Sequence, residues 1–174
     1  MSYRPTNYGL VPTQIYYDDV NNSVIRFYYV GLSSATALQP VLVIVDKDNK
    51  TVTYTNCTIT GSYSVNYTIT DCATCHFTPF LSRINNDYYL SVYFSSYDDH
   101  GSDNNSRIIT FKIDKSNPSS LTFISQINLT GRLKDYISLN YPYNTDIVIP
   151  SNVGCHRLTF NGSNWTKTDL TTVG

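Results

Sequence analysis

Alternation of apolar and polar residues with a period of two runs through most of this chain. Such alternation is typical of half-buried β-strands. Short groups rich in Asp, Asn, Ser and Gly separate the runs, and these residues favour turns. The runs predict twelve strands, at 11–18, 23–30, 40–46, 51–59, 77–84, 88–96, 107–114, 121–128, 136–142, 145–151, 155–161 and 165–172. Good helix formers are scarce between them, so we expect an all-β fold.

The predicted strands fall into groups of four, which indicates antiparallel four-stranded units. In each group the third and fourth strands form a hairpin that is closed by an Asn-containing turn. The units cover about 11–60, 77–130 and 136–172, and a long link at 61–75 joins the first two. We expect residues 1–174 to form a single all-β domain.

Four-stranded units of this length resemble the blades of β-propeller repeat proteins. The segment Thr159-Phe-Asn-Gly-Ser-Asn-Trp165 is similar to a degenerate Asp-box hairpin of sialidase-type propellers. Three blades are half of the six-bladed ring of sialidases and viral attachment glycoproteins. The resemblance therefore implies either a fragment of a longer chain or a domain that pairs with another copy. A single β-sandwich or jelly roll is the alternative that the same burial pattern permits.

The four-strand grouping predicts that short turns and long loops lie on opposite sides of the domain. Successive antiparallel strands reverse direction, so the first and third turns of each unit share one side. The long loops 32–39 and 97–105 and the link 61–75 share the other side. Binding sites on rigid β-scaffolds are found on such loops, so we expect the long-loop side to carry the function.

The most polar loop and a second Tyr-containing segment supply the candidate binding residues. Tyrosine side chains can stack on sugars or anchor a protein partner. The carboxylates could contact a sugar or hold Ca²⁺, although no EF-hand pattern is present. A solvated hairpin loop is the alternative interpretation. The candidates are Tyr97, Asp98, Asp99, His100, Tyr141 and Tyr143.

Adjacent tyrosines recur at 16–17, 28–29 and 88–89. Neighbouring residues of a strand point to opposite faces. We therefore expect one Tyr of each pair to be packed between sheets.

The segment Asp71-Cys-Ala-Thr-Cys-His76 has the spacing of a c-type haem attachment site, of half a zinc site or of a redox pair. The following residues indicate a strand, whereas cytochromes c and thioredoxin-like motifs continue with a helix. Zinc could draw further ligands from Cys155 and His156, but this second half is unusual. We therefore expect no cofactor and no metal here.

Structural disulfides are the interpretation we prefer for the four cysteines, which allow three pairings. A Cys57–Cys72 bond would close a link of about fifteen residues. A Cys75–Cys155 bond would then connect the second unit to the third.

Composition narrows the choice of compartment and partner. The formal net charge is −1 and the basic residues are scattered, so nucleic acid is not an expected partner. No apolar run is long enough for a transmembrane helix. The N-terminus does not resemble a signal peptide, and this predicts either a mature fragment or a cytosolic chain. Eight N-glycosylation sequons are present where composition predicts roughly four, which favours an extracellular or virion-surface glycoprotein. They begin at Asn21, Asn49, Asn56, Asn66, Asn104, Asn128, Asn161 and Asn164.

These observations favour binding to a cell-surface protein or glycan over catalysis. All thirteen acidic residues are Asp, whereas glycosidases usually need a pair of carboxylates, one of them often Glu. The alternatives are a fragment of a sialidase-like propeller enzyme and a structural β-domain of a capsid or tail.

Overall fold

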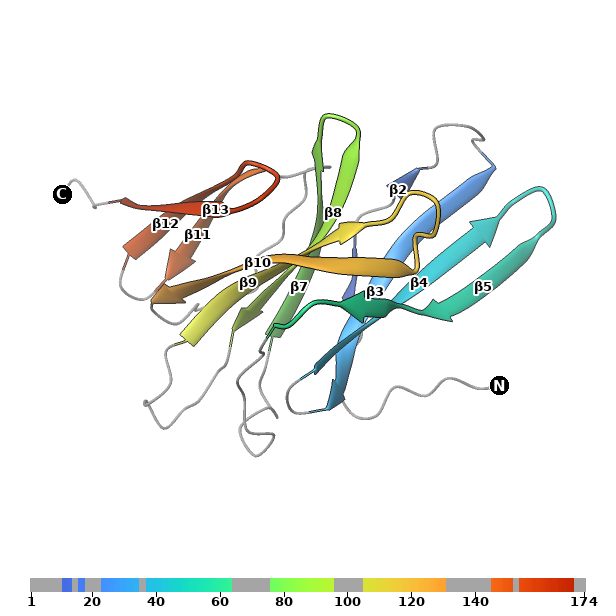
Figure 1. Ribbon diagram of the computed structural model, residues 1–174, viewed down its shortest axis with the longest axis horizontal. Helices are drawn as coiled ribbons and strands as arrows, with labels where there is room; N and C mark the ends of the chain where they lie inside the picture. The colour runs from blue at the N-terminus through green and yellow to red at the C-terminus, as the bar shows by residue number, and fades with distance from the viewer. Residues whose placement is uncertain are drawn as a thin grey trace.

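The computed structural model describes residues 11–13, 16–17, 23–34, 37–63, 76–95, 105–130, 145–151 and 154–170. Within these ranges the chain forms three β-sheets and no helix (Figure 1). All strand pairs except one are antiparallel. The predicted all-β, antiparallel fold is therefore confirmed.

The first sheet, sheet A, contains β1 to β5. β3 (Val24–Ser34), β4 (Ala37–Asp46) and β5 (Thr51–Asn56) form a meander. The short strands β1 (Val11–Pro12) and β2 (Tyr16–Tyr17) both pair with β3. Val, Ile and Tyr dominate β3 and β4, which suits a pleated and half-buried surface.

The second sheet, sheet B, has the strand order β6-β10-β9-β8-β7. Four consecutive strands form its meander: β7 (His76–Ile84), β8 (Asp87–Ser95), β9 (Asn105–Ile113) and β10 (Ser120–Thr130). The fifth strand, β6 (Thr58–Thr60), pairs with β10 in parallel. The predicted first unit, 11–60, therefore ends in the second sheet rather than in its own.

The third sheet, sheet C, contains β11 (Asp146–Ser151), β12 (Gly154–Phe160) and β13 (Trp165–Leu170). All three match predicted strands of the third unit. The strand predicted at 136–142 lies outside the described residues.

Sheet B is the middle layer and is buried on both faces. On one face, Leu90 and Phe111 pack with Tyr28 and Leu42 of sheet A. On the other face, Tyr93 and Ile108 join a cluster that contains Leu158 and Trp165 of sheet C. Successive residues of a strand point to opposite faces, so β8 and β9 supply side chains to both cores. This explains why both Tyr88 and Tyr89 are buried, at 4% and 5% exposure, although we expected only one residue of that pair in a core.

A β-bulge divides β10 between the two cores. Phe123 lies opposite Phe111, but the next paired residue is Ser125, opposite Thr110. Ile124 is therefore an extra residue, as in a β-bulge. Before the bulge, Leu121 and Phe123 pack in the core between sheets A and B. After it, Leu129 packs in the core between sheets B and C.

The three sheets are open, and no closed propeller ring is formed by the part of the chain that the structure describes. Stacked open sheets also fit the β-sandwich alternative.

The predicted loop at 32–39 is wrong. β3 and β4 form a long hairpin that leaves only residues 35–36 between them, because Leu38 continues the apolar alternation and is 3% exposed.

Candidate functional site

The strand ends of sheet B show which connections share a side. His76 lies opposite Ser95, Ser95 lies opposite Ser106, and Asn105 lies opposite Thr130. The start of β7, the end of β8, the start of β9 and the end of β10 therefore meet at one end of the sheet. We call this end of sheet B the loop edge.

The opposite end carries the short hairpin turns and is called the turn edge here. It comprises 47–50, 85–86, 114–119 and 161–164, at the top and right of Figure 1. Gly162 of the last turn is close to Tyr89 and Ile84 of sheet B: a Cβ atom added to it would be 3.4 Å from the Tyr89 hydroxyl oxygen. The turns of sheets B and C are therefore neighbours. In two of the turns the residue with positive φ is of a type that adopts it readily: Asn85 has φ 55° and Gly162 has φ 96°.

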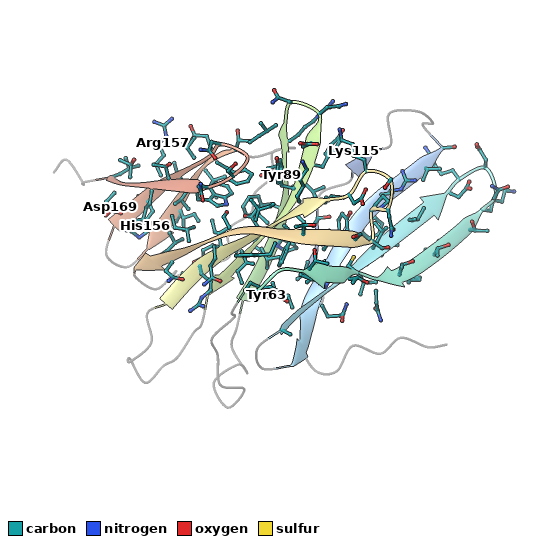
Figure 2. The ribbon with its side chains drawn as sticks, in the orientation of Figure 1. Tyr63, Tyr89, Lys115, His156, Arg157 and Asp169 are labelled. Atoms are coloured by element: carbon teal, nitrogen blue, oxygen red, sulfur yellow. The ribbon has the colours of Figure 1, made fainter. Side chains whose placement is uncertain are left out.

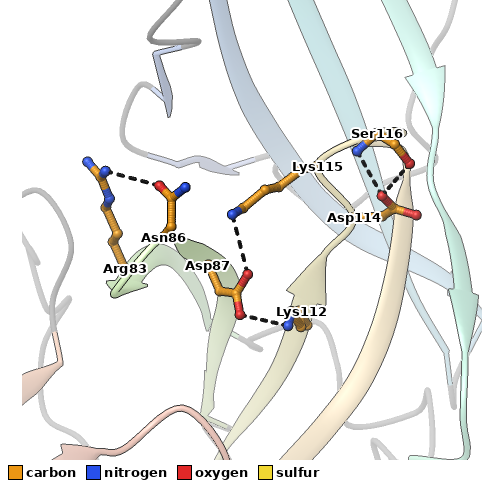
Figure 3. A network of polar contacts seen from close by, with 7 residues as sticks. All are labelled: Arg83, Asn86, Asp87, Lys112, Asp114, Lys115 and Ser116. Carbon is orange, nitrogen blue, oxygen red and sulfur yellow. Dashed lines mark hydrogen bonds and ion pairs between the residues drawn. The ribbon is translucent and has the colours of Figure 1, made fainter.

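Side chains at the turn edge are bonded to one another. Lys112 Nζ and Lys115 Nζ lie 2.7 and 3.5 Å from the Asp87 carboxylate (Figure 3). These bonds and the two positive charges lower the pKa of Asp87. Asp114 Oδ1 accepts hydrogen bonds from the backbone N–H and the hydroxyl of Ser116, at 2.8 and 2.7 Å. These described side chains bond to one another, and the turn edge therefore offers a control surface away from the loop edge.

The most distinctive polar cluster is on sheet C, near the start of β12 and the end of β13. His156 of β12 lies opposite Asp169 of β13, and Nδ1 of the imidazole is 2.6 Å from Oδ1 of the carboxylate. Lys167 Nζ is 3.2 Å from the same oxygen atom. Figure 2 shows His156 and Asp169 together near the end of the sheet.

In this pair the histidine is buried and the aspartate is exposed, whereas a catalytic histidine–aspartate dyad has the opposite arrangement. The His156 side chain is 5% exposed, and the Asp169 side chain is 63% exposed. A catalytic imidazole must reach the substrate while its carboxylate is buried behind it. The pair therefore suits an anchor between β12 and β13 better than a proton-transfer site.

Asp169 should make the stability of the fold pH-dependent. Hydrogen bonds from His156 and then from Lys167 lower its pKa. Because the pKa is lower in the folded chain than in the unfolded chain, the ionised carboxylate stabilises the fold above about pH 4. This contribution is lost as the pH falls through and below that range. We expect Asp169→Asn to lower the urea midpoint at pH 7 and to have little effect at pH 3.

Asp48→Asn is the matched control, because Asp48 is in an exposed turn. It should leave both midpoints unchanged. An equal effect of Asp169→Asn at pH 7 and pH 3 would contradict a role for the charge.

The structure does not contain the two predicted disulfides. Cys57 and Cys155 are both free thiols, and the predicted pairs each require one of them. Cys57 belongs to the core between sheets A and B, so a bond from it would have to form inside that core. Cys72 and Cys75, the other two partners, lie outside the described residues.

Cys57 should resist alkylation in the folded protein. Burial raises the pKa of its thiol from 9.0 to about 12, which reduces the reactive thiolate by about a thousandfold. We expect iodoacetamide at pH 8 to modify the half-buried Cys155 and to spare Cys57, whereas both react in guanidinium chloride. Peptide mapping by mass spectrometry measures each site separately, and comparable rates at both sites under native conditions would refute the prediction.

The candidate binding residues of the sequence analysis all lie outside the described residues: Tyr97, Asp98, Asp99, His100, Tyr141 and Tyr143. The structure locates only the residues that flank their segments. Of the eight sequon asparagines, those at 21, 66 and 104 also lie outside. The other five have exposed side chains: Asn49, Asn56, Asn128, Asn161 and Asn164.

The pairing of His156 with Asp169 was missed in the sequence, although a signal for it exists. The turn Asn161–Asn164 fixes the register of the last hairpin, since Phe160 lies opposite Trp165. Counting outward from that turn leads to His156 opposite Asp169. Among the described residues, no three His, Cys or Asp side chains are grouped closely enough to hold a metal ion.

No protein-family model, curated protein or solved structure matches this chain. The resemblance to propeller blades therefore stays a prediction.

No helix in the described part of the chain is long and apolar enough to cross a membrane.

Proposed function

We propose that this chain is an extracellular or virion-surface domain that binds a glycan of the cell surface through the segments at its loop edge. One observation carries the proposal. Asn105 directly follows segment 96–104, and Thr130 directly precedes segment 131–144. These two flanking residues are directly opposite each other in sheet B. All of the candidate binding residues belong to these two segments, which are thus anchored side by side.

The scaffold beneath these anchor points favours a recognition role. β9 and β10, which carry them, belong to the layer that is buried on both faces. Functional loops that project from such rigid sheets are common in binding proteins. The two segments combine Tyr with Asp, Asn and His, so rings could stack on a sugar while polar groups bind its hydroxyls. We propose that the chain acts by binding alone, and that its units are propeller-like blades.

The sequons support an extracellular setting for this role. Each of the five described sequon asparagines is exposed, which is the geometric condition for attachment of a glycan. Asn161 also accepts backbone hydrogen bonds from Ser163 and Asn164 through Oδ1, at 2.9 and 2.8 Å. Its Nδ2 atom, where a glycan would be attached, is not needed for that turn.

Binding to a glycan array and to cultured cells tests the proposal. We expect Tyr97→Ala and the double variant Tyr141→Ala/Tyr143→Ala to reduce binding at least tenfold, or about 1.4 kcal/mol, because aromatic anchors dominate such interfaces. Lys115→Ala at the turn edge is the control and should bind like the wild type. A loss caused by the control and not by the Tyr variants would overturn the proposal. Cell binding that survives enzymatic removal of surface glycans would indicate a protein ligand instead.

A further inference from the structure

β5 is the exposed edge of sheet A. It pairs with β4 on one side, and among the described strands none pairs with its other side. Five of its six residues are exposed. Val52 and Tyr54 are 51% and 63% exposed and are two of the four exposed large hydrophobic side chains in the part of the chain that the structure describes. Unpaired strand edges are sites at which further strands can add.

The other described edge strands carry features that discourage such pairing. Proteins protect their edges with Pro, with charged residues or with very short strands. β2 and β6 have only two and three residues. Protective residues are present in the remaining edge strands: Pro12 in β1, Pro79 in β7, Asp146 and Pro150 in β11, and Lys167 and Asp169 in β13. β5, with the sequence TVTYTN, has no Pro and no charge.

The backbone of β5 has donors and acceptors that point to this free edge. The Cys57 N–H donates to the Pro40 carbonyl at 2.9 Å, one position beyond the pair of Asn56 with Val41. Hydrogen-bonded pairs occur at every second residue of an antiparallel ladder. Counting back in steps of two from the bonded residue Cys57 leads to residues 55, 53 and 51. The backbone groups of these three threonines are therefore bonded to β4. The N–H and C=O groups of Val52 and Tyr54 point away from it.

We propose that β5 is an interface between two copies of this chain, paired antiparallel about a two-fold axis at Thr53. In this register Val52 lies opposite Tyr54 of the second copy, and these residues form roughly four backbone hydrogen bonds. Thr53 lies opposite Thr53 of the second copy, and Thr51 lies opposite Thr55. The proposal does not depend on the ligand proposed above.

The sequence of β5 fits its own copy better than an unrelated strand. Positions at equal distances from Thr53 match, since residues 51 and 55 are both Thr and residues 52 and 54 are both apolar. Val–Tyr and Thr–Thr are favourable cross-strand pairs. On a charged strand, a two-fold axis would bring like charges close together. β5 has no charged residue, so its pairing with a second copy meets no such repulsion. The Asn56 side chain projects from a face of the sheet, so a glycan on it is compatible with pairing.

Single cysteines test this register. Thr53→Cys should give an intermolecular disulfide, because residues opposite each other in a non-hydrogen-bonded pair are about 4.5 Å apart between Cα atoms, within the range that a disulfide spans. Thr51→Cys and Thr55→Cys alone should not cross-link, since each would be roughly 13 Å from its own copy. A mixture of these two variants should cross-link. Non-reducing electrophoresis measures all four samples against the wild type, whose own thiols give the background.

Oligomeric state tests the interface without cysteine. Light scattering of the wild type should rise from 19.7 kDa towards twice that mass with concentration. Val52→Pro removes an N–H that β4 does not use, so it should fold and remain a monomer. Val52→Thr keeps the N–H and should still dimerise. A wild type that is monomeric at all concentrations would overturn the proposal, as would a Val52→Pro dimer or equal cross-linking of Thr53→Cys and Thr51→Cys.

Discussion

Replacement of Trp165 by alanine should reduce the free energy of unfolding by about 3–5 kcal/mol. Trp165 is 7% exposed and joins sheet C to sheet B. Its ring stacks on Phe160 at 4.9 Å between centroids and meets the edge of Phe80 at 5.9 Å. Its Nε1–H donates to the Thr110 hydroxyl at 2.8 Å. Alanine would remove both aromatic contacts and this hydrogen bond and would leave a cavity.

Urea unfolding followed by circular dichroism is the suitable measurement, because Trp165 is the only tryptophan and its fluorescence is lost in the variant. Trp165→Phe is the matched control. It keeps a ring but removes the N–H from Thr110, so a loss of about 1–2 kcal/mol is expected. A loss below about 1 kcal/mol for Trp165→Ala would mean that sheet C is not anchored through this residue.

The corresponding residue between sheets A and B is Tyr28, and Tyr28→Ala should also cost about 3–5 kcal/mol. Tyr28 is fully buried. Its hydroxyl donates to the Pro118 carbonyl in the β9–β10 turn at 2.8 Å. The loss therefore combines a large cavity with a partly buried carbonyl group that has lost a donor.

Tyr28→Phe separates these two contributions, since it removes only the hydroxyl. We expect it to cost about 1 kcal/mol, measured by the same urea unfolding. If Tyr28→Phe were as damaging as Tyr28→Ala, the hydrogen bond to Pro118 and not the packing of the ring would hold the two sheets together. If Tyr28→Ala were neutral, the observed core between sheets A and B would be refuted.

The positions of the strands could be predicted from the sequence because alternation and turn residues are local signals. β9 and β10, for example, follow the predicted runs at 107–114 and 121–128 closely. Which sheet is the middle layer is a tertiary property. The nearly continuous apolar run in β8, DYYLSVYFS, is typical of a strand that is buried on both faces, but β4 of sheet A has a similar run, ALQPVLVIVD, so this signal does not identify the middle layer.

The change of sheet at Cys57 could not be predicted for a similar reason. The alternation in 51–59 shifts by one residue at Asn56, where β5 ends, but the shift does not indicate that the next residues join β10 as β6. The Thr58 N–H donates to the Ser119 carbonyl at 2.8 Å, so the turn of a distant hairpin decides where the strand divides. The predicted pairing of Cys57 with Cys72 failed at the same point, since Cys57 turns into the core.

The shared end of the two connections that precede β9 and follow β10 was predicted correctly, because it follows from strand order alone, whereas the link 61–75 leaves from β6 beside Thr122 and reaches that end only at His76. The anchor of His156 to Asp169 depends on the register of a hairpin, and register becomes certain only when the turn geometry is known. Candidate residues in the two long segments carry no such constraint in the sequence.

The bulge in β10 has a consequence for changes in chain length. Leu121, Phe123, Ile127 and Leu129 are all odd-numbered, so a regular strand would present them to one face, whereas the bulge assigns the last two to the other core. Removal of Ile124 alone would regularise the ladder and preserve every pair on both sides of it. Removal of Phe123 or Ser125 would also close the bulge, with Ile124 taking the vacant position, whereas removal of a residue further from the bulge would turn over the segment between that residue and the bulge. Position 124 is therefore the place in β10 at which a single-residue deletion keeps every existing pair of the ladder, and we expect it to be the best tolerated.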